Sequence, residues 1–324
     1  MIRNIVRALA CALALLSPLL ISLTWAQSYP SRPIDFIIPL AAGDATDTAA
    51  RAIAERLSRD LNVPIVPVNK PGAGGALGTD LIVNAPKDGT TIGIPNNAAL
   101  VFRALLEPSS ANHDPLTDLT PLALAMRSPS VLVVGAEQPF RSFAEMVAYS
   151  KTNPGKVRIG TAGIGSVGDF CVQTINSLTG AGLVMVPFKG AVPAVTAMRG
   201  AHIEGVVLAL GTMVGHLQSG VVRGIVISSK WPDFANIPTM EELGYRQPLF
   251  GVWTGIFAPA GVPAEVTQVL VPALERAIRA PDLAAKLKPL GILADYAPPD
   301  KLVAEMKDEQ ERVRKIGKAA GLLK

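Results

Sequence analysis

The sequence alternates short apolar runs with amphipathic helical patterns along almost its whole length, and this alternation limits the possible folds most strongly. The apolar runs are typical of β-strands and end at Gly, Pro or Asn, as at 34–39 and 157–160. Between them, apolar residues recur at spacings of three and four, as at 46–57 and 167–178, which predicts helices. Fully apolar strands that alternate with helices form parallel sheets covered on both faces. The predicted fold class is therefore α/β.

Two stretches of the chain repeat the same unit. The strand, glycine-containing loop and helix at 34–57 recur at 157–178. The run Val66-Pro-Val-Asn-Lys70 is likewise echoed by Val186-Pro-Phe-Lys189. We therefore expect two doubly wound lobes that each present the same pair of loops.

The end of the chain indicates how the lobes divide the sequence. From residue 265 onward the pattern is almost wholly helical, and we expect this stretch to return to the first lobe. The apolar content of 49% is sufficient to bury two cores of ordinary domain size. We assign 27–124 plus 250–324 to lobe 1 and 125–249 to lobe 2.

Residues 1–26 have the features of a secretory signal peptide. Two arginines are followed by an apolar run from 8 to 16 that extends to 23, and small residues lead to a cleavage point after Ala26. A retained membrane anchor is the alternative, but the run is shorter than the ~20 apolar residues that span a bilayer and Pro18 interrupts it. We expect a mature, periplasmic chain that begins at Gln27.

Cysteine content and charge exclude several classes of protein. Cleavage of the signal peptide removes Cys11 and leaves Cys171 alone, so no internal disulfide can form. The formal net charge is +4, of which Arg3 and Arg7 would leave with the signal peptide. No basic block or acidic tail is present, which makes nucleic acid an unfavourable partner.

The loop at 39–47 joins a predicted strand to a predicted helix. Gly43 allows a tight backbone path, and the first N–H groups of the helix lack intrahelical acceptors, which makes this turn a candidate anion site. The alternative is that Asp44 is an N-cap and that Asp47 completes a capping box, which requires no ligand.

A second candidate loop, at 160–169, has a G-x-G-x-x-G pattern between a strand and a helix. The acidic residue that should hold a ribose about 20 residues later is missing, so a carboxylate held by Thr161, Ser166 and the helix N-terminus is favoured over a dinucleotide. The glycine cluster at 69–78 lacks the Gly-Lys-Ser/Thr of a phosphate loop. Lys189 could pair with an anion or remain solvated.

No set of catalytic or metal-binding residues is evident. The histidines at 113, 202 and 216 have no spaced ligand partners, so we expect no metal and no cofactor. Ser166 is not in a G-x-S-x-G elbow, and Cys171 is more typical of core packing than of a nucleophile. We expect that the protein is not an enzyme.

The motifs together resemble the solute receptors of tripartite tricarboxylate transporters, the Bug family. The motifs lie in fixed order over the whole mature chain: Tyr29-Pro-Ser-Arg-Pro-Ile34, the loop 39–47, Asn69-Lys-Pro-Gly-Ala-Gly-Gly75, Pro86-Lys-Asp-Gly89, Val186-Pro-Phe-Lys-Gly190, Ile237-Pro-Thr239 and Ala258-Pro-Ala-Gly-Val-Pro263. The resemblance implies a two-lobed periplasmic binding protein, type II-like, that closes on a carboxylate and delivers it to a membrane permease.

The resemblance also implies where the ligand binds. In this family, two loops from facing lobes grip one carboxylate through backbone amides and ordered water. The matching positions are Ala42, Gly43, Thr46 and Asp47 in one loop and Thr161, Gly163 and Ser166 in the other.

Three departures from the family pattern bear on the ligand. Asp44 replaces a usual glycine, Asp169 stands where histidine is frequent, and Asn96 replaces a small residue. Two extra carboxylates near the cleft would repel a tricarboxylate. We therefore expect a small organic acid with one carboxylate, or an amide, whose remainder is neutral, cationic or aromatic.

The sequence thus predicts a monomeric solute-binding receptor that serves integral membrane permease subunits. Two alternatives remain open at this point. One is an exported hydrolase that uses Ser166 or Cys171 with Asp169. The other is a ligand sensor for a signalling kinase.

Overall fold

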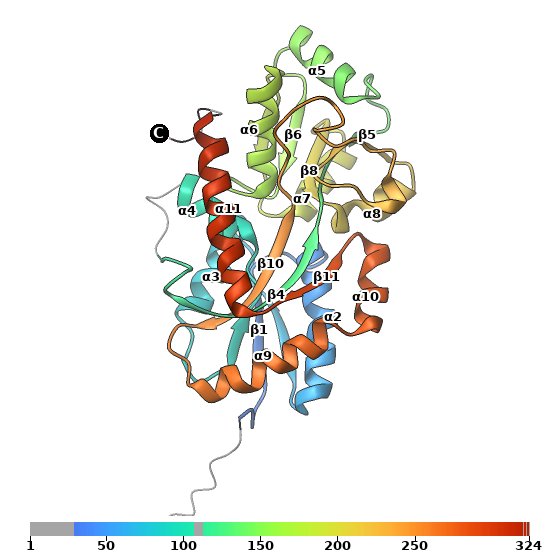
Figure 1. Cartoon of the computed structure of the whole chain (residues 1–324). Coiled ribbons are helices and arrows are strands. Elements are labelled where there is room, and N and C mark those ends of the chain that lie inside the picture. The colour runs from blue at the N-terminus through green and yellow to red at the C-terminus, as the bar shows by residue number, and fades with distance from the viewer. Residues whose placement is uncertain (1–28, 107–112, 320, 322, 324) are drawn as a thin grey trace, which may run out of the picture.

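The computed structural model in Figure 1 describes residues 29–106, 113–319, 321 and 323. The predicted signal peptide at 1–26 and its cleavage point lie outside these residues. In the part of the chain that is described, no helix has both the length and the apolar character needed to cross a membrane.

The first of two sheets has six strands in the order β11-β4-β10-β3-β1-β2. Strands β1, β2 and β3 are parallel, whereas β10 is antiparallel to β3 and β4, and β11 is antiparallel to β4. The strand bounds are β1 (Ile34–Ile38), β2 (Ile65–Asn69), β3 (Thr91–Gly93), β4 (Leu119–Ser128), β10 (Val252–Pro259) and β11 (Leu293–Ala297).

The second sheet has five strands in the order β7-β6-β8-β5-β9. Here β6 is parallel to β7 and β8, and β5 is antiparallel to β8 and β9. The bounds are β5 (Ser130–Gly135), β6 (Arg158–Thr161), β7 (Val184–Pro187), β8 (Gly205–Ala209) and β9 (Val222–Ile227). The predicted α/β class is confirmed, but both sheets are mixed rather than parallel, because chain segments that cross between lobes enter each sheet from its opposite end.

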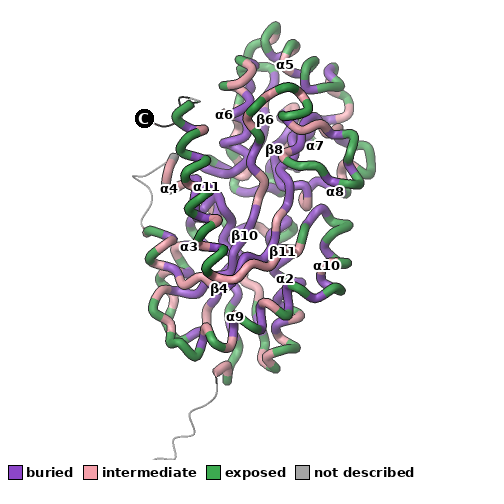
Figure 2. Tube along the Cα trace, in the orientation of Figure 1, coloured by how far each residue is buried: buried purple, intermediate pink, exposed green. Residues whose placement is uncertain are grey.

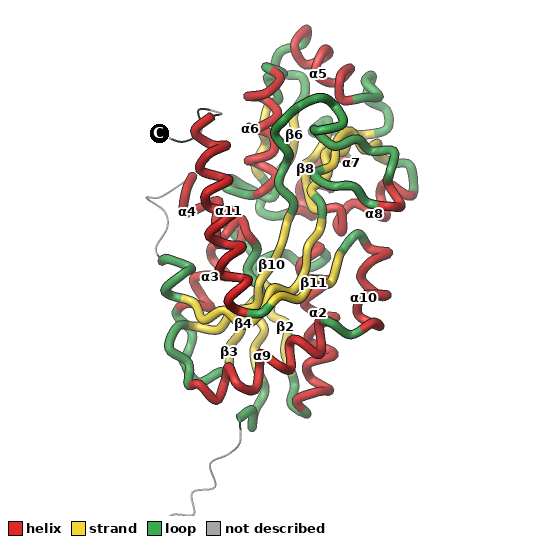
Figure 3. The backbone as a smooth tube through the Cα atoms, in the orientation of Figure 1, coloured by secondary structure: helices red, strands yellow, loops and turns green. Residues whose placement is uncertain are grey.

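Figure 3 shows helices around both sheets, and the strand alternation explains why both faces of the first sheet are covered. Ile34, Phe36 and Ile38 pack into one core with α2 and α9, while Ile37 packs into another with α3 and α11. The helices of this lobe are α2 (Ala45–Leu61), α3 (Ala76–Val83), α4 (Arg103–Leu106), α9 (Ala264–Ile278), α10 (Pro281–Leu287) and α11 (Pro299–Ala319). A π-helical turn at Ala98–Phe102 precedes α4.

The second lobe carries four helices in the described chain: α5 (Phe143–Thr152), α6 (Val167–Thr179), α7 (Ala191–Arg199) and α8 (Leu210–Gln218). Buried segments in Figure 2 follow the strands and continue from one lobe into the other. The C-terminal helices α9 and α11 lie on the first sheet (Figure 1).

The chain crosses between the sheets twice. The first crossover joins β4, which ends at Ser128, to β5, which begins at Ser130; the second runs from Ile227 to Val252. Domain limits at 124/125 and 249/250 stay a prediction.

Three phenylalanines pack together where the second crossover meets both lobes. Phe102 precedes α4, Phe170 lies in α6 and Phe250 lies in the crossover, with ring centroids 5.2 to 5.5 Å apart and T-shaped geometry. Such edge-to-face contacts add about 0.5–1.5 kcal/mol each to the burial of the rings. The junction between the lobes is therefore firmly packed at this point.

Candidate functional site

The helices α2 and α6 begin in the same way on opposite sides of the space between the sheets. Asp44 is the N-cap of α2, and its Oδ1 accepts a hydrogen bond of 2.8 Å from the backbone N–H of Thr46. Ser166 is the N-cap of α6, and its Oγ accepts a bond of 3.2 Å from the N–H of Asp169. Each side chain satisfies one of the free N–H groups of its helix end.

The loops before the two helices are shaped by a matching pair of carboxylates. Asp47 accepts from the N–H of Gly43, and Asp169 accepts from the N–H of Gly165, both at 2.9 Å. The receiving glycines have φ of +84° and +72°, a conformation that favours glycine. Asp47 and Asp169 therefore hold the loops in shape.

Asp47 also accepts from Arg51 and Asn69, each at 2.9 Å. Burial alone would raise the pKa of Asp47, but these two donors and Gly43 outweigh it and lower the pKa. Asp169 accepts from Gln173 at 2.7 Å. The two acids thus occupy equivalent positions in the first turns of their helices. Asp47 accepts from the charged guanidinium of Arg51, whereas Asp169 accepts from the neutral amide of Gln173.

A small cavity of about 40 Å³ lies between the lobes at these helix starts. Asp44, Asn96 and Ser166 are the predicted site residues that line it. The other lining residues are Leu40, Ser130, Ala162, Val167, Gly168, Val207, Leu208, Ala209 and Val252. The walls are thus mainly apolar, with a few convergent polar groups, as in ligand sites generally.

The remaining predicted residues divide into two groups. Thr46, Asp47, Thr161, Gly163 and Asp169 are buried within the two loops, whereas Ala42, Gly43 and Lys189 are exposed. Gly43 lines a wider groove of about 540 Å³ beside α7 and α8, and Lys189 is outside the lining of both hollows. Direct ligand contact by these residues stays a prediction.

Asp44 has an unusual electrostatic environment for an acid that faces a ligand space. Burial raises its pKa, Thr46 lowers it through hydrogen bonding, and the nearby charge of Asp47 raises it further. No cationic side chain of the described residues contributes to this balance. An ionised Asp44 would therefore be stabilised by a ligand group that donates a hydrogen bond or carries positive charge.

The lobes are closed on one another. The N–H of Ala45 in lobe 1 donates to Thr212 Oγ1 of α8 at 3.3 Å. A Cβ on Gly74 of the glycine cluster would lie 3.4 Å from the carbonyl oxygen of Ile164. A cavity this small holds little more than one or two waters, so it must widen to hold an organic ligand.

Several lining residues escaped the sequence analysis. Ser130 and Val252 stand at the first residues after the crossovers, and Leu40 follows β1, where no local motif marks a ligand wall. Thr212, which contacts Ala45 across the lobes, carries no motif either, and Gly74 belongs to the glycine cluster at 69–78, for which no contact between the lobes was expected. Only the topology brings these positions together.

The groups expected for the hydrolase alternative have other roles here. Cys171 is buried, its Sγ lies 3.6 Å from the carbonyl oxygen of Phe250, and burial raises its pKa to about 12. It therefore stays a thiol at neutral pH, and the thiol is a poor nucleophile. The Oγ of Ser166 is engaged as an N-cap. Among the described residues no group of three or more His, Cys, Asp or Glu side chains could hold a metal ion.

Comparison with known proteins gives a consistent result. A model of the "Tripartite tricarboxylate transporter family receptor" matches residues 49–322. A UPF0065 protein from the tcbD-tcbE intergenic region of Pseudomonas sp. (strain P51) is 32% identical over 90% of this chain and 87% of its own length.

Solved structures of similar proteins share the fold. The periplasmic binding protein BugD is 29% identical with a TM-score of 0.86, over 91% of this chain and 99% of that one. MatC from Rhodopseudomonas palustris, with bound malate, is 29% identical with a TM-score of 0.83, over 89% and 99% of the two chains. R. palustris Rpa4515, solved with adipate, is 26% identical with a TM-score of 0.86, over 90% and 98%.

Proposed function

Because this chain belongs to the tripartite tricarboxylate transporter receptor family, we propose that its cleft holds one carboxylate of a small organic solute between the starts of α2 and α6. The protein is a periplasmic solute-binding receptor, as its family and the similarity to BugD indicate. Its ligand, its site residues and its cleaved signal peptide are parts of the proposal.

The observation that carries the proposal is a cavity between the lobes that is lined by both N-caps, Asp44 and Ser166. Each helix start presents N–H groups and the positive end of a helix dipole, worth about 0.3–1 kcal/mol when exposed and up to about 2 kcal/mol when partly buried. Two such ends hold an anion without a fixed countercharge. Closure of the lobes then removes water and strengthens these interactions.

Asp44 makes a fully anionic ligand unfavourable. Related proteins have been solved with malate and with adipate, which are dicarboxylates. In this chain Asp44 lines the cavity and no cationic side chain of the described residues offsets its burial, so a second or third carboxylate beside it would repel the ionised acid or raise its pKa further. We therefore infer a ligand with one carboxylate, or an amide, and a neutral, cationic or aromatic remainder.

The closed receptor would deliver its solute to membrane permease subunits, and we propose that it acts as a monomer and not as an enzyme. In the alternative function, a ligand sensor for a signalling kinase, the receptor would bind its ligand in the same way and present it to the kinase instead. The molar mass of the purified protein, measured by light scattering, tests whether it is a monomer. Co-purification of permease subunits from membranes in the presence of ligand distinguishes delivery to a permease from sensing.

The ligand proposal is tested by thermal denaturation of protein that has first been unfolded and refolded to release bound solute. The panel contains benzoate, malate, adipate, citrate and the amides of the first two. A ligand that binds the native protein alone adds about 2.7 kcal/mol of stability at a hundredfold excess over Kd. No stabilisation by any member of the panel would count heavily against a carboxylate receptor.

Ser166→Ala tests the site, and Ser142→Ala is the matched control. Ser142 is the N-cap of α5 in the same lobe and accepts from Glu145 N–H at 3.2 Å, as Ser166 does from Asp169. Loss of either cap costs about 1 kcal/mol of stability. Only Ser166→Ala should also weaken ligand affinity; equal affinity in both variants would show that the second loop has been wrongly assigned.

A further inference from the structure

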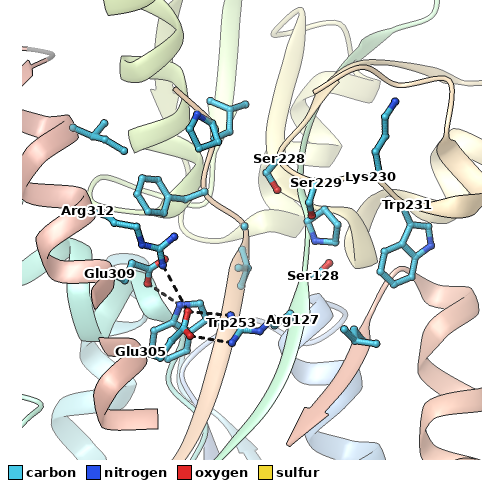
Figure 4. Close-up of a pocket in the computed structure, with 18 residues that line it drawn as sticks. Arg127, Ser128, Ser228, Ser229, Lys230, Trp231, Trp253, Glu305, Glu309 and Arg312 are labelled. Atoms are coloured by element: carbon cyan, nitrogen blue, oxygen red, sulfur yellow. Dashed lines mark hydrogen bonds and ion pairs between the residues drawn. The ribbon is translucent and has the colours of Figure 1, made fainter. Parts of the chain in front are cut away.

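A buried carboxylate beside the second crossover belongs to none of the groups described above. Glu309 lies in α11 with an exposed fraction of 2%. It lines a cavity of about 440 Å³ beside the crossovers, together with Trp253, Gly251 and Arg312. Figure 4 shows its carboxylate facing the indole of Trp253.

Glu309 is fully engaged by two buried donors. Its Oε2 accepts from Trp253 Nε1 at 2.7 Å, and its Oε1 accepts from Asn97 Nδ2 at 3.2 Å. Asn97 is completely buried and Trp253 is 3% exposed. A buried N–H that loses such an acceptor costs about 1–3 kcal/mol.

Asn97 also contacts the second crossover, so the hydrogen bond from Asn97 to Glu309 links the crossover to α11. Its Nδ2 also donates to the carbonyl oxygen of Gly251 at 3.0 Å, and its Oδ1 accepts from the backbone N–H of Trp253 at 3.4 Å. One amide side chain therefore ties α11, the crossover and the first residues of β10 together.

The residue before Asn97 is Asn96, which lines the ligand cavity. Asn96 pairs with Thr254 of β10 in a β-bridge, and its Oδ1 accepts from the N–H of Ala99 at 3.2 Å. Asn96 lines the cleft, whereas the next residue, Asn97, begins the helical turn with φ −60° and ψ −24° and donates to Glu309. The orientation of Asn96 thus depends on how Asn97 is held.

We propose that Glu309 is a positioning residue for the ligand cleft: its carboxylate holds Asn97, which fixes both the cavity residue Asn96 and the crossover at Gly251. Glu309 itself does not reach the ligand. This inference rests on the cleft function proposed above.

The charged groups around Glu309 are few. Arg312 and Glu305 lie on the same helix, and Arg127 of β4 pairs with Glu305 at 3.1 Å. On α4, which also packs on this helix, Arg103 donates to the carbonyl oxygen of Ala73 at 2.9 Å. Burial is the main cause that raises the pKa of Glu309 to about 7, against lowering by Asn97, Trp253 and Arg312.

The experiment compares Glu309→Leu and Glu309→Gln with the control Glu305→Gln, which alters an acid of the same helix and the same cavity. Hydrogen exchange, read by mass spectrometry without ligand, follows the amides at 96–100 and 251–255. We expect about tenfold faster exchange in Glu309→Leu, a smaller effect in Glu309→Gln, which keeps one acceptor, and none in the control. Unchanged exchange in Glu309→Leu overturns the proposal.

A spectroscopic readout separates positioning from a general loss of stability. In a Trp231→Phe background of the chain that begins at Gln27, Trp253 is the remaining tryptophan. Its emission should change with a midpoint near pH 7 when Glu309 is present, and not in Glu309→Gln. An identical midpoint in both proteins would show that another group is titrating and would contradict the proposal.

Ligand affinity completes the test, with benzoate, malate and adipate as probes. Glu309→Leu should bind about tenfold more weakly than Glu305→Gln, although neither residue touches the ligand. If the wild-type protein binds none of the three, the function proposed for the cleft fails while the exchange and emission results still decide the role of Glu309. If the wild-type protein does bind and Glu309→Leu has the same affinity as the control, the positioning role of Glu309 is overturned.

Discussion

Asp47 and Asp169 occupy equivalent positions in opposite lobes, each accepting a 2.9 Å hydrogen bond from the N–H of the glycine four residues before it. Each acid is the third residue of its helix, and each helix is capped by the side chain three residues earlier. The unit that recurs in the sequence at 34–57 and 157–178 therefore also repeats the hydrogen bond between a loop glycine and a helix carboxylate. The two lobes present equivalent helix ends to the space between them.

The ion pair of Asp47 with Arg51 makes the stability that the first loop contributes depend on pH. The pKa of Asp47 is lowered in the folded protein, so its contribution to stability is present above its ordinary pKa of 3.8 and is lost as pH falls through the lower folded value. We expect Asp47→Asn to reduce the free energy of unfolding by about 2 kcal/mol at pH 7. Urea denaturation measures this.

The difference between Asp47→Asn and wild type should shrink below pH 3.8, where the wild-type carboxylate also becomes protonated. Asp35→Asn, at an exposed position of β1, is the control and should match the wild type at both pH values. A penalty for Asp47→Asn that is constant with pH would mean that the ionised form is not what holds the loop.

Asp44 is expected to set the preference against highly charged ligands. Replacing it in Asp44→Gly removes the acid and keeps a residue that is tolerated as an N-cap, at a cost of a few tenths of a kcal/mol. Citrate affinity, measured by calorimetry, should rise at least about tenfold in this variant, since the buried acid that a third carboxylate would repel or force to take up a proton has been removed. Tight binding of citrate by the wild-type protein would contradict the ligand proposal.

Much of the fold was predictable because burial patterns are local. The strand and helix at 34–57 and their repeat at 157–178 are visible in the sequence as continuous apolar runs followed by three-and-four spacing. The antiparallel direction of β10 was not predicted. It results from a return of the chain from the second lobe, which no local pattern encodes.

Local sequence patterns predicted the candidate site only where it follows a helix start, and the cavity residue Asn96 was identified through the family resemblance. Asp44 and Ser166 are marked by loop glycines and by capping chemistry, which are short-range signals. Val252 and Thr212 reach the interlobe surface through tertiary structure alone. Lys189, singled out as a cation near a strand end, is exposed, because a lysine side chain readily remains in water.

Glu309 gives a second pH dependence, of opposite sign. Its pKa is raised from an ordinary 4.5 to about 7, so between these values the folded chain binds more protons than the unfolded chain. The free energy of unfolding therefore falls as pH rises through this window, by at most about 3 kcal/mol. Glu309→Gln should abolish this slope in melting temperatures between pH 5 and about 8. A slope that survives the substitution would assign it to another group.

The last prediction concerns closure, which two glycines of α8 allow us to test. A Cβ on Gly211 would lie 2.6 Å from Ile292 Cγ1 and 2.8 Å from Ala45 Cβ, both in the opposite lobe. The Ile292 side chain can rotate away, but Ala45 is fixed as the first residue of α2. A Cβ on Gly215, one turn later in the same helix, would meet nothing within 4 Å.

Gly211→Ala and Gly215→Ala both replace a glycine of α8, a change worth up to about 0.5–1 kcal/mol of helix propensity, but only Gly211→Ala creates a close contact across the lobes. We expect Gly215→Ala to bind ligand as the wild type does and Gly211→Ala to bind about tenfold more weakly, because closure must overcome a steric overlap. Small-angle scattering with saturating ligand should show a larger radius of gyration for Gly211→Ala alone. If Gly211→Ala closes and binds normally, the contact of α8 with α2 is not part of the closing motion, and the seal must lie at Gly74 and Ile164 instead.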